Sequence, residues 1–272
     1  MDSPVDEVAF LARSENRVRV LRSLDEGTRT RRELREELAV SRTTLGRTLN
    51  EFEDRGLARR TAEGYATTPA ADAILAKFVP LLETVEGIRN LGEALDWLPP
   101  PARELEVRDF RDADVTTATT DNPAAPFDRG LELIRGAEEY RGLTATAIPR
   151  YVEALVDGHR AGRLAVEGVI EARFVEGLGE DAERAARWRY FAERPLVRVH
   201  EGPVPINMHV VDGTVAIWLG ERRADAPNDE DGMEIHGLLE SDRPAVLSWA
   251  ESLYEAYRAE AEPLELAAVT DA

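Results

Sequence analysis

Residues 30–50 read TRRELREELAVSRTTLGRTLN and have the pattern of two short helices joined by a tight turn. Thr30 and Glu33 predict a capping box at the start of the first helix, and Ser41 predicts the cap of the second. The apolar side chains recur at helical spacing in both segments: Leu34, Leu38, Leu45, Leu49 and Phe52. Two short helices of this kind, the second preceded by a serine cap, are typical of a helix-turn-helix.

The sequence on either side predicts a compact unit around these helices. Before them, one helix is expected from Ser3 to Gly27, because Ser3 and Pro4 suit a helix start and Gly27 suits an end. After them, two β-prone runs flank a glycine-containing turn and predict a hairpin over residues 58–68. This order of elements predicts a winged helix-turn-helix over residues 1–68, with the hairpin as the wing.

The polar face of the second helix indicates DNA binding. Arginine can form paired hydrogen bonds with guanine, asparagine can do the same with adenine, and arginines of a wing can face phosphates. The side chains predicted to contact DNA are Arg29, Arg31, Ser41, Arg42, Thr43, Thr44, Arg47, Asn50, Arg59, Arg60 and Tyr65. A unit of this shape that binds another protein instead of DNA is the alternative.

Charge divides the chain into two parts. The whole sequence holds 53 acidic and 34 basic residues, for a net charge of -19. Residues 1–68 contain 13 arginines and 13 acidic residues, so the rest of the chain carries the entire excess of negative charge. The neutral first part is therefore the only place where a polyanion such as DNA could dock without strong repulsion.

The composition also bears on the cellular setting. The chain has no cysteine, which excludes disulfides, cysteine-type zinc sites and thiol nucleophiles, and its only lysine is Lys77. Such an acidic chain suits a cytoplasm at molar salt, where the Debye length is about 3 Å; replacement of lysine by arginine in a GC-rich mesophile is the alternative. Without a long apolar run or a signal-peptide pattern, the expected location is cytoplasmic, with no membrane partner.

A connecting helix is predicted after the hairpin. Its apolar residues follow a heptad pattern interrupted only by Gly92: Ile74, Phe78, Leu81, Val85, Ile88 and Leu95. Pro80 lacks an amide hydrogen and should kink or split the helix. Because helix-turn-helix proteins usually bind DNA as dimers, these residues are expected to join two copies of the chain. A helix packed on its own chain is the alternative.

The three prolines at residues 99–101 predict a stiff linker, so residues 69–101 form a connecting segment and the last domain begins at residue 102. Beyond it, strand-like and helix-like runs alternate, and Asp212-Gly213 between two apolar runs predicts a hairpin. The candidate strands are residues 115–119, 143–148, 164–175, 196–200, 206–211 and 214–219, and the candidate helices are residues 127–140, 151–159, 182–191 and 246–261. This alternation predicts an α/β domain with a mostly parallel central sheet.

Two parts of the sequence resemble known regulators. Residues 10–68, through LREELAVSRTT at residues 34–44, resemble the winged-helix domain of archaeal, and in particular haloarchaeal, transcriptional regulators. GLLESD at residues 237–242 and WAESLYEAY at residues 249–257 resemble the effector domain of methanogenic-filament-type regulators. That domain is similar in outline to the C-terminal domain of TrmB-like regulators, a relative of the phospholipase D fold. The resemblance implies a transcription factor whose last domain senses a ligand or forms assemblies.

Catalysis and metal binding are not expected. A phospholipase-D-type enzyme would need His-x-Lys, but His209 is followed by Val210 and Val211, so the fold is expected without that chemistry. No two of the four histidines have helical ligand spacing, and the carboxylate-rich residues 225–232 miss the EF-hand spacing. We therefore predict no enzyme activity, no metal and no cofactor.

A small-molecule effector would bind in the α/β domain, near strand ends. The polar candidates within apolar strands are Thr144, Thr146, Arg173, Arg198, His200 and His209. The arginines suggest an anionic ligand, although buried ion pairs would explain them equally well. Trp188, Tyr190 and Trp218 either line such a pocket or pack in the core.

Together these patterns predict a dimeric, sequence-specific DNA-binding transcriptional regulator whose last domain modulates DNA binding. Its expected partners are double-stranded DNA, a second copy of the chain and a small molecule. The alternatives are a degenerate phosphodiesterase and a chromatin-associated protein without sequence preference.

Overall fold

A computed structural model describes residues 3–176, 178, 182–222 and 233–266. The chain forms two compact units, Met1–Leu82 and Glu83–Ala272. The division falls inside helix α5 (Pro69–Leu91), which continues past Pro80 as one helix. The division therefore lies earlier in the chain than the boundary expected at the three prolines, because the segment around the prolines packs in the second unit.

The first unit contains four helices, a hairpin and the start of α5. Their bounds are α1 (Pro4–Ala12), α2 (Glu15–Asp25), α3 (Arg31–Leu38), α4 (Arg42–Asp54), β1 (Ala58–Arg60) and β2 (Tyr65–Thr67). Ser3, Thr30 and Ser41 cap α1, α3 and α4 as expected, each accepting a hydrogen bond from the backbone amide three residues on. Ala39, in the left-handed conformation at φ 53°, ends α3 and makes the tight turn before α4.

The single helix expected from Ser3 to Gly27 is instead two helices. Ser14 adopts an extended conformation, and its hydroxyl accepts a hydrogen bond from the amide of Arg17. This serine cap starts α2 afresh and lets Phe10 and Leu11 of α1 pack in the same core as Val18. The core of the unit also takes in Leu75 and Phe78 from α5.

The second unit is built on a mixed sheet. Among the described residues its eight strands lie in the order β10-β6-β5-β4-β7-β8-β9-β3. Their bounds are β3 (Asp114–Thr117), β4 (Glu139–Thr144), β5 (Ala165–Glu171), β6 (Val197–His200), β7 (Met208–Val211), β8 (Thr214–Arg222), β9 (Met233–Ser241) and β10 (Glu262–Pro263). Only β4 with β5 and β5 with β6 pair in parallel, while every other pairing is antiparallel.

The expectation of a mostly parallel sheet is therefore wrong. Helices connect the parallel strands, as the alternation predicted, because a parallel pair needs a crossover. The hairpin at Asp212-Gly213 forces β7 and β8 to run in opposite directions, and β9 and β3 extend that antiparallel half. The strand β9 was not among the candidate strands.

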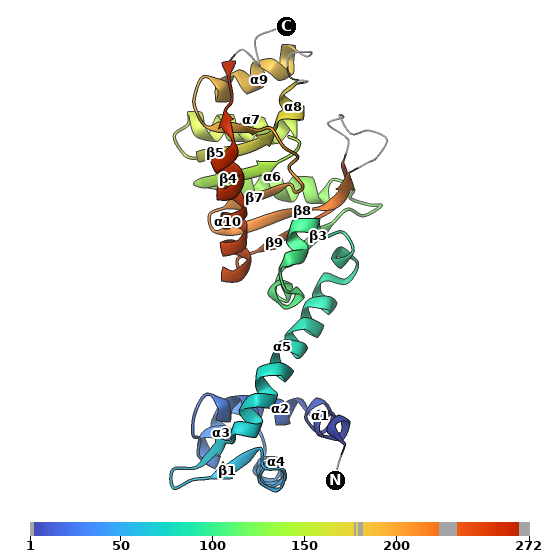
Figure 1. The fold of residues 1–272 in the computed structure, drawn as a ribbon, viewed down its shortest axis with the longest axis vertical. Coiled ribbons are helices and arrows are strands. Elements are labelled where there is room, and N and C mark those ends of the chain that lie inside the picture. The colour runs from blue at the N-terminus through green and yellow to red at the C-terminus, as the bar shows by residue number, and fades with distance from the viewer. Residues whose placement is uncertain (1–2, 177, 179–181, 223–232, 267–272) are drawn as a thin grey trace. The chain divides into compact units, whose positions relative to one another are not determined.

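Helices cover both faces of this sheet (Figure 1). Their bounds are α6 (Ala125–Gly136), α7 (Pro149–Arg160), α8 (Ala172–Glu176), α9 (Ala182–Ala192) and α10 (Pro244–Glu260). Helices α6, α7 and α9 pack on one face, and α10 packs on the other together with short helical turns at Gly92–Leu95, Pro100–Glu104 and Val107–Phe110.

The segment with the three prolines is part of this second core. Leu98 and Ala102 are buried on the α10 face of the sheet, in the same cluster as Phe110. A linker would leave these side chains in water, so the expected hinge is instead a packed element of the second unit.

Two element boundaries differ in ways that affect candidate site residues. Strand β4 ends at Thr144, so Thr146 lies in the turn before α7. Strand β5 ends at Glu171 and is followed by α8, which places Arg173 on a helix instead of a strand. No helix in the described part of the chain is long and apolar enough to cross a membrane.

Candidate functional site

The polar face of α4 is exposed in the first unit. We define the α4 polar face as Ser41, Arg42, Thr43, Arg47 and Asn50, all of which are exposed. The opposite side of the helix carries buried leucines and Phe52. The Ser41 hydroxyl lies 2.9 Å from that of Thr44, which is half-buried, so these two side chains hold the start of the helix. Arginine, hydroxyl and amide groups thus share one accessible helix face.

The two arginines of this face are weakly held by their own chain. Arg47 is 3.9 Å from Glu51, but Glu51 accepts a much shorter hydrogen bond of 2.8 Å from Arg17. Arg42 has no ion pair within the described residues. Exposed pairs as long as that of Arg47 contribute little, so both guanidinium groups are available to an outside partner.

Two of the predicted DNA contacts have structural roles. Tyr65 is buried, and its hydroxyl accepts a 2.8 Å hydrogen bond from Arg60, while Arg31 lies 5.3 Å from its ring centre. Arg29 is half-buried and pairs with Glu37, and its backbone forms a bridge to that of Tyr65. Tyr65 thus supports the arginines around it and Arg29 ties the hairpin to the helices, while contact of either residue with DNA stays a prediction. Arg31, Arg59 and Arg60 remain exposed.

The heptad residues divide between the two cores and the solvent. Phe78 is buried and Ile74 packs in the first core, while Leu95 packs in the second. The other three are exposed on α5: Leu81 by 55%, Val85 by 38% and Ile88 by 46%. We call these three the α5 apolar stripe. Ile74, Phe78 and Leu95 pack within their own chain, so for them the heptad reflects core packing.

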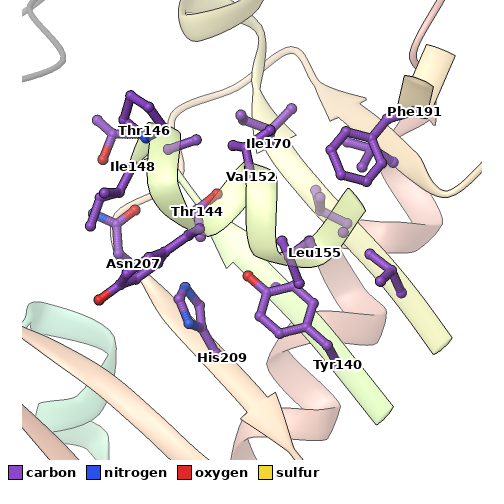
Figure 2. A pocket seen from close by; sticks show the side chains of 18 of the residues that line it. Tyr140, Thr144, Thr146, Ile148, Val152, Leu155, Ile170, Phe191, Asn207 and His209 are labelled. Atoms are coloured by element: carbon purple, nitrogen blue, oxygen red, sulfur yellow. The ribbon is translucent and has the colours of Figure 1, made fainter. Parts of the chain in front are cut away.

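A cavity of about 380 Å³ lies in the second unit on the face of the sheet covered by α7 and α9. Figure 2 shows side chains of β4, β7 and α7 converging on it. Of the predicted ligand-binding residues, Thr144, Thr146 and His209 line the cavity. Trp188 and Trp218 also line it, whereas Tyr190 does not.

The other three predicted residues lie away from the cavity. Arg198 donates to the carbonyl of Ala261, and the ring of His200 stacks 4.7 Å from that of Tyr257. Arg173, on α8, is not among the described residues that line the cavity. The anionic ligand suggested by these arginines therefore has no counterpart at the cavity.

Gly142, Gly168 and His209 line the floor of the cavity and belong to a row of neighbouring residues across the sheet. The registers of the sheet place Gly168 beside Gly142, Gly142 beside His209, and His209 beside Ala216. These two glycines, the histidine and the alanine are therefore register partners across the four adjacent strands β5, β4, β7 and β8. A Cβ on Gly168 would meet nothing closer than a methyl group of Val197 at 3.5 Å, so open space lies above it. Mid-strand glycines were the sequence signal that could have located this cavity.

Burial keeps His209 uncharged. Its ring lies among three aromatic rings, 5.1 Å from Tyr140 and 6.2 Å from both Tyr151 and Trp218. Loss of hydration lowers the pKa of His209 to about 4. The imidazole is therefore neutral near pH 7, with one donor and one acceptor nitrogen.

Hydrogen bonds fix the walls around this histidine. The side-chain oxygen of Asn207 accepts a 2.7 Å bond from the amide of Ala145, and the Tyr151 hydroxyl donates to the carbonyl of Phe127. Burial raises the pKa of Tyr140 and of Tyr151, so both phenols stay protonated. The cavity is thus a preformed, aromatic-lined space with a few fixed polar groups, the usual composition of a small-molecule site.

The described residues contain no cluster of three or more potential metal ligands. The carboxylate-rich residues 225–232 lie outside the described residues.

Comparison with known proteins identifies the second unit. Residues 123–260, just over half of the chain, match the family described as "Methanogenesis regulatory protein FilR1, middle domain". The chain belongs to this FilR1 middle-domain family. Residues 5–90 match the HVO_A0261 N-terminal domain. The expected resemblance to a filament-regulator effector domain is confirmed.

Solved structures show more distant likenesses. The phospholipase D family member Nuc from Salmonella typhimurium is 15% identical, with a TM-score of 0.43 over 57% of this chain and 99% of that one. TrmBL2, titled an archaeal chromatin protein, is 17% identical, with a TM-score of 0.39 over 96% of this chain and 100% of that one. NucT from Helicobacter pylori is 12% identical, with a TM-score of 0.41 over 56% and 98%. Among the curated proteins no match was found.

Proposed function

We propose that the protein is a DNA-binding transcriptional regulator whose first unit is a winged helix-turn-helix. The observation that carries the proposal is the exposed α4 polar face, with Arg42 and Arg47 weakly held in a part of the chain that has no net charge. In this arrangement α4 enters the major groove, where arginine and asparagine read base edges. The match to a FilR1 regulatory domain supports a role in transcription.

The hairpin β1–β2 acts as the wing in this proposal. Arg59 and Arg60 are exposed on β1, and Arg60 is held by the Tyr65 hydroxyl. Guanidinium groups at fixed positions beside the recognition helix suit contacts to phosphates, which orient the protein without reading sequence.

The chain acts as a homodimer in this proposal, with a second copy covering the α5 apolar stripe. Exposed apolar side chains at positions 81, 85 and 88 recur in steps of four and three, the spacing of a helix-to-helix seam. Val85→Glu and Ile88→Glu together should convert a dimer into a monomer in sedimentation, because they place charge in that seam. Arg89→Glu, an exposed neighbour outside the stripe, is the control. A wild-type monomer, or a double variant that stays dimeric, contradicts this part of the proposal.

The second unit acts as a sensor, not an enzyme, in this proposal. The cavity supports a ligand site, and His209 has no lysine two residues on, where Val211 stands. Among the described residues that line the cavity, neither a charged imidazole nor another cationic side chain is available to bind a substrate phosphate. Hydrolysis of a phosphodiester substrate that disappears in His209→Ala would favour an enzyme instead.

Selection from a random duplex library tests sequence-specific binding. The wild-type protein should enrich a discrete motif with two half-sites, and Arg47→Ala should relax the base preference within each half-site. Arg13→Ala is the matched control, because Arg13 is exposed but lies off the α4 polar face. Binding without enrichment would point to a chromatin-associated protein without sequence preference, and no binding at all would contradict the proposal.

A further inference from the structure

The cavity of the second unit contains no charged side-chain group among its described lining residues. Glu167 contributes to the lining, but its carboxylate lies 3.5 Å from the Tyr254 hydroxyl and 3.8 Å from Arg258. Both partners belong to α10, which packs on the opposite face of the sheet. The carboxylate therefore points away from the cavity, and the lining itself is neutral.

The polar groups of the cavity are gathered toward one side. Figure 2 places Thr146, Asn207 and His209 on one side of the space, and Leu155 and Phe191 on the other. Among the described residues no hydrogen bond to the imidazole of His209 is found, and its recorded contacts are the three aromatic rings. The cavity thus has a hydrogen-bonding side and an apolar side.

The space is too large to be a packing defect. Cores pack at the density of organic crystals, and few voids in them exceed the size of a water molecule. The volume of about 380 Å³ falls within the range of ligand sites. Gly168 adds no side chain to this face of β5, although a Cβ there would make only ordinary van der Waals contacts. The glycine therefore leaves open space that a side chain at this position would occupy in part.

We propose that this cavity binds an uncharged, mainly apolar small molecule that carries a hydrogen-bonding group at one end. The inference rests on the proposed sensor role and names the class of molecule sensed. Carboxylates, phosphates and ammonium compounds are excluded, because an ion would lose its hydration and find no opposite charge. The neutral state of His209 near pH 7 adds to this exclusion, since the imidazole offers a hydrogen bond but no positive charge.

Two sets of probes test this inference, each with one apolar body and a neutral, an anionic or a cationic head group. The aromatic set is 2-naphthol, 2-naphthoate and 2-naphthylmethylammonium, and the aliphatic set is 1-octanol, octanoate and octylammonium. Calorimetric titration of the full chain at molar KCl should show binding of a neutral member, with both charged members at least ~100-fold weaker because of the cost of burying an unpaired ion. Binding should also change tryptophan fluorescence, because Trp188 and Trp218 line the cavity.

Two variants locate the binding. Gly168→Val should fold, since a Cβ at this position meets only ordinary van der Waals contacts, and should weaken binding by narrowing the cavity. His209→Leu should weaken 2-naphthol by about tenfold through loss of one hydrogen bond. Gly136→Ala is the control, because nothing lies within 4 Å of the added atom and the site is exposed. Thermal unfolding of each variant checks that it is folded.

Probe binding and DNA selection test the ligand class and the regulator proposal independently. Equal or tighter binding of a charged probe, no binding of either neutral probe up to its solubility limit, or unchanged binding in a folded Gly168→Val variant would overturn the inference. If the chain still enriches a DNA motif in that case, the regulator proposal stands. If a neutral probe binds but no DNA does, the regulator proposal fails and the ligand class stands.

Discussion

The two arginines of the α4 polar face and two arginines of the second unit have opposite surroundings. In the first unit, Arg42 and Arg47 lie exposed with at most a 3.9 Å ion pair. In the second unit, Arg129 donates to both carboxylate oxygens of Glu240 at 2.8 Å, and Arg243 donates to Asp112 at 2.7 Å. Arg129 and Arg243 are thus held by carboxylates of their own chain in the unit with an acidic excess. Arg42 and Arg47, in the unit without net charge, are left for another molecule.

The largest expected effect concerns DNA affinity. Replacing Arg42 and Arg47 with alanine should weaken binding to the selected duplex by at least ~30-fold, since each base contact is worth about 1–3 kcal/mol. Stability in denaturant should change by less than about 0.5 kcal/mol, because both side chains are exposed. Fluorescence anisotropy and urea unfolding measure the two quantities. Unchanged affinity would mean that the exposed arginines of α4 do not bind DNA.

The next effect concerns His209 and pH. Its pKa is lowered to about 4 by burial, whereas an unfolded chain keeps about 6.5. The unfolded state therefore binds an extra proton as pH falls below about 6.5, and the folded state loses stability down to about pH 4. The loss is up to about 3 kcal/mol. His209→Leu should lack this contribution, so the wild type should lose more stability than the variant between about pH 7 and about pH 4.5.

Unfolding measurements at the two pH values give this difference. A parallel decline in both proteins would mean that His209 is hydrated. The cavity would then be wetter than the aromatic rings around it indicate.

A smaller effect concerns the stability of the second unit. Arg129→Met should lower the free energy of unfolding by about 1–3 kcal/mol, because it leaves the Glu240 carboxylate, 7% exposed, without its paired donor. The partial exposure of Arg129, at 42%, holds the loss below that of a fully buried pair. DNA affinity should not change. Arg129→Met combined with Glu240→Leu should recover part of the loss, and a variant as stable as wild type would show that the pair is solvated.

The smallest effect concerns salt. Arg60→Ala should weaken binding to all duplexes alike, by roughly threefold to tenfold, as expected of a phosphate contact. The logarithm of the affinity should fall with the logarithm of the KCl concentration by less than about 0.9 per phosphate contact, since the net negative charge of the second unit attracts cations. Anisotropy titrations from low to molar KCl give the slope. A steep loss on every sequence would mean that the acidic excess does not influence binding.

Local signals predicted the first unit better than the second. The capping boxes at Ser3 and Thr30 and the cap at Ser41 are decided within four residues of chain, and all form as expected. Even there, the Ser14 cap was missed, because the apolar spacing runs through it without a break. Strand direction in the second unit depends on residues far apart: β4 pairs with β7 across more than sixty residues.

The candidate site was predictable only in part for the same reason. Thr144 and His209 were recognised as polar residues in apolar strands, and both line the cavity. Arg198 and His200 fit that description equally well, yet the carbonyl of Ala261 and the ring of Tyr257 occupy them. These partners lie more than fifty residues further along the sequence, so no local pattern predicts the contacts. The space beside Gly168 exists only once strands β4 and β5 are in register.

The adjacent glycines also bear on how such proteins diversify. At Gly168 the backbone tolerates a side chain, so a single codon change could shrink or reshape the chamber while the surrounding sheet stays as it is. In the proposed regulator, such a change would alter which molecules the cavity accepts while the sheet and α4 stay as they are.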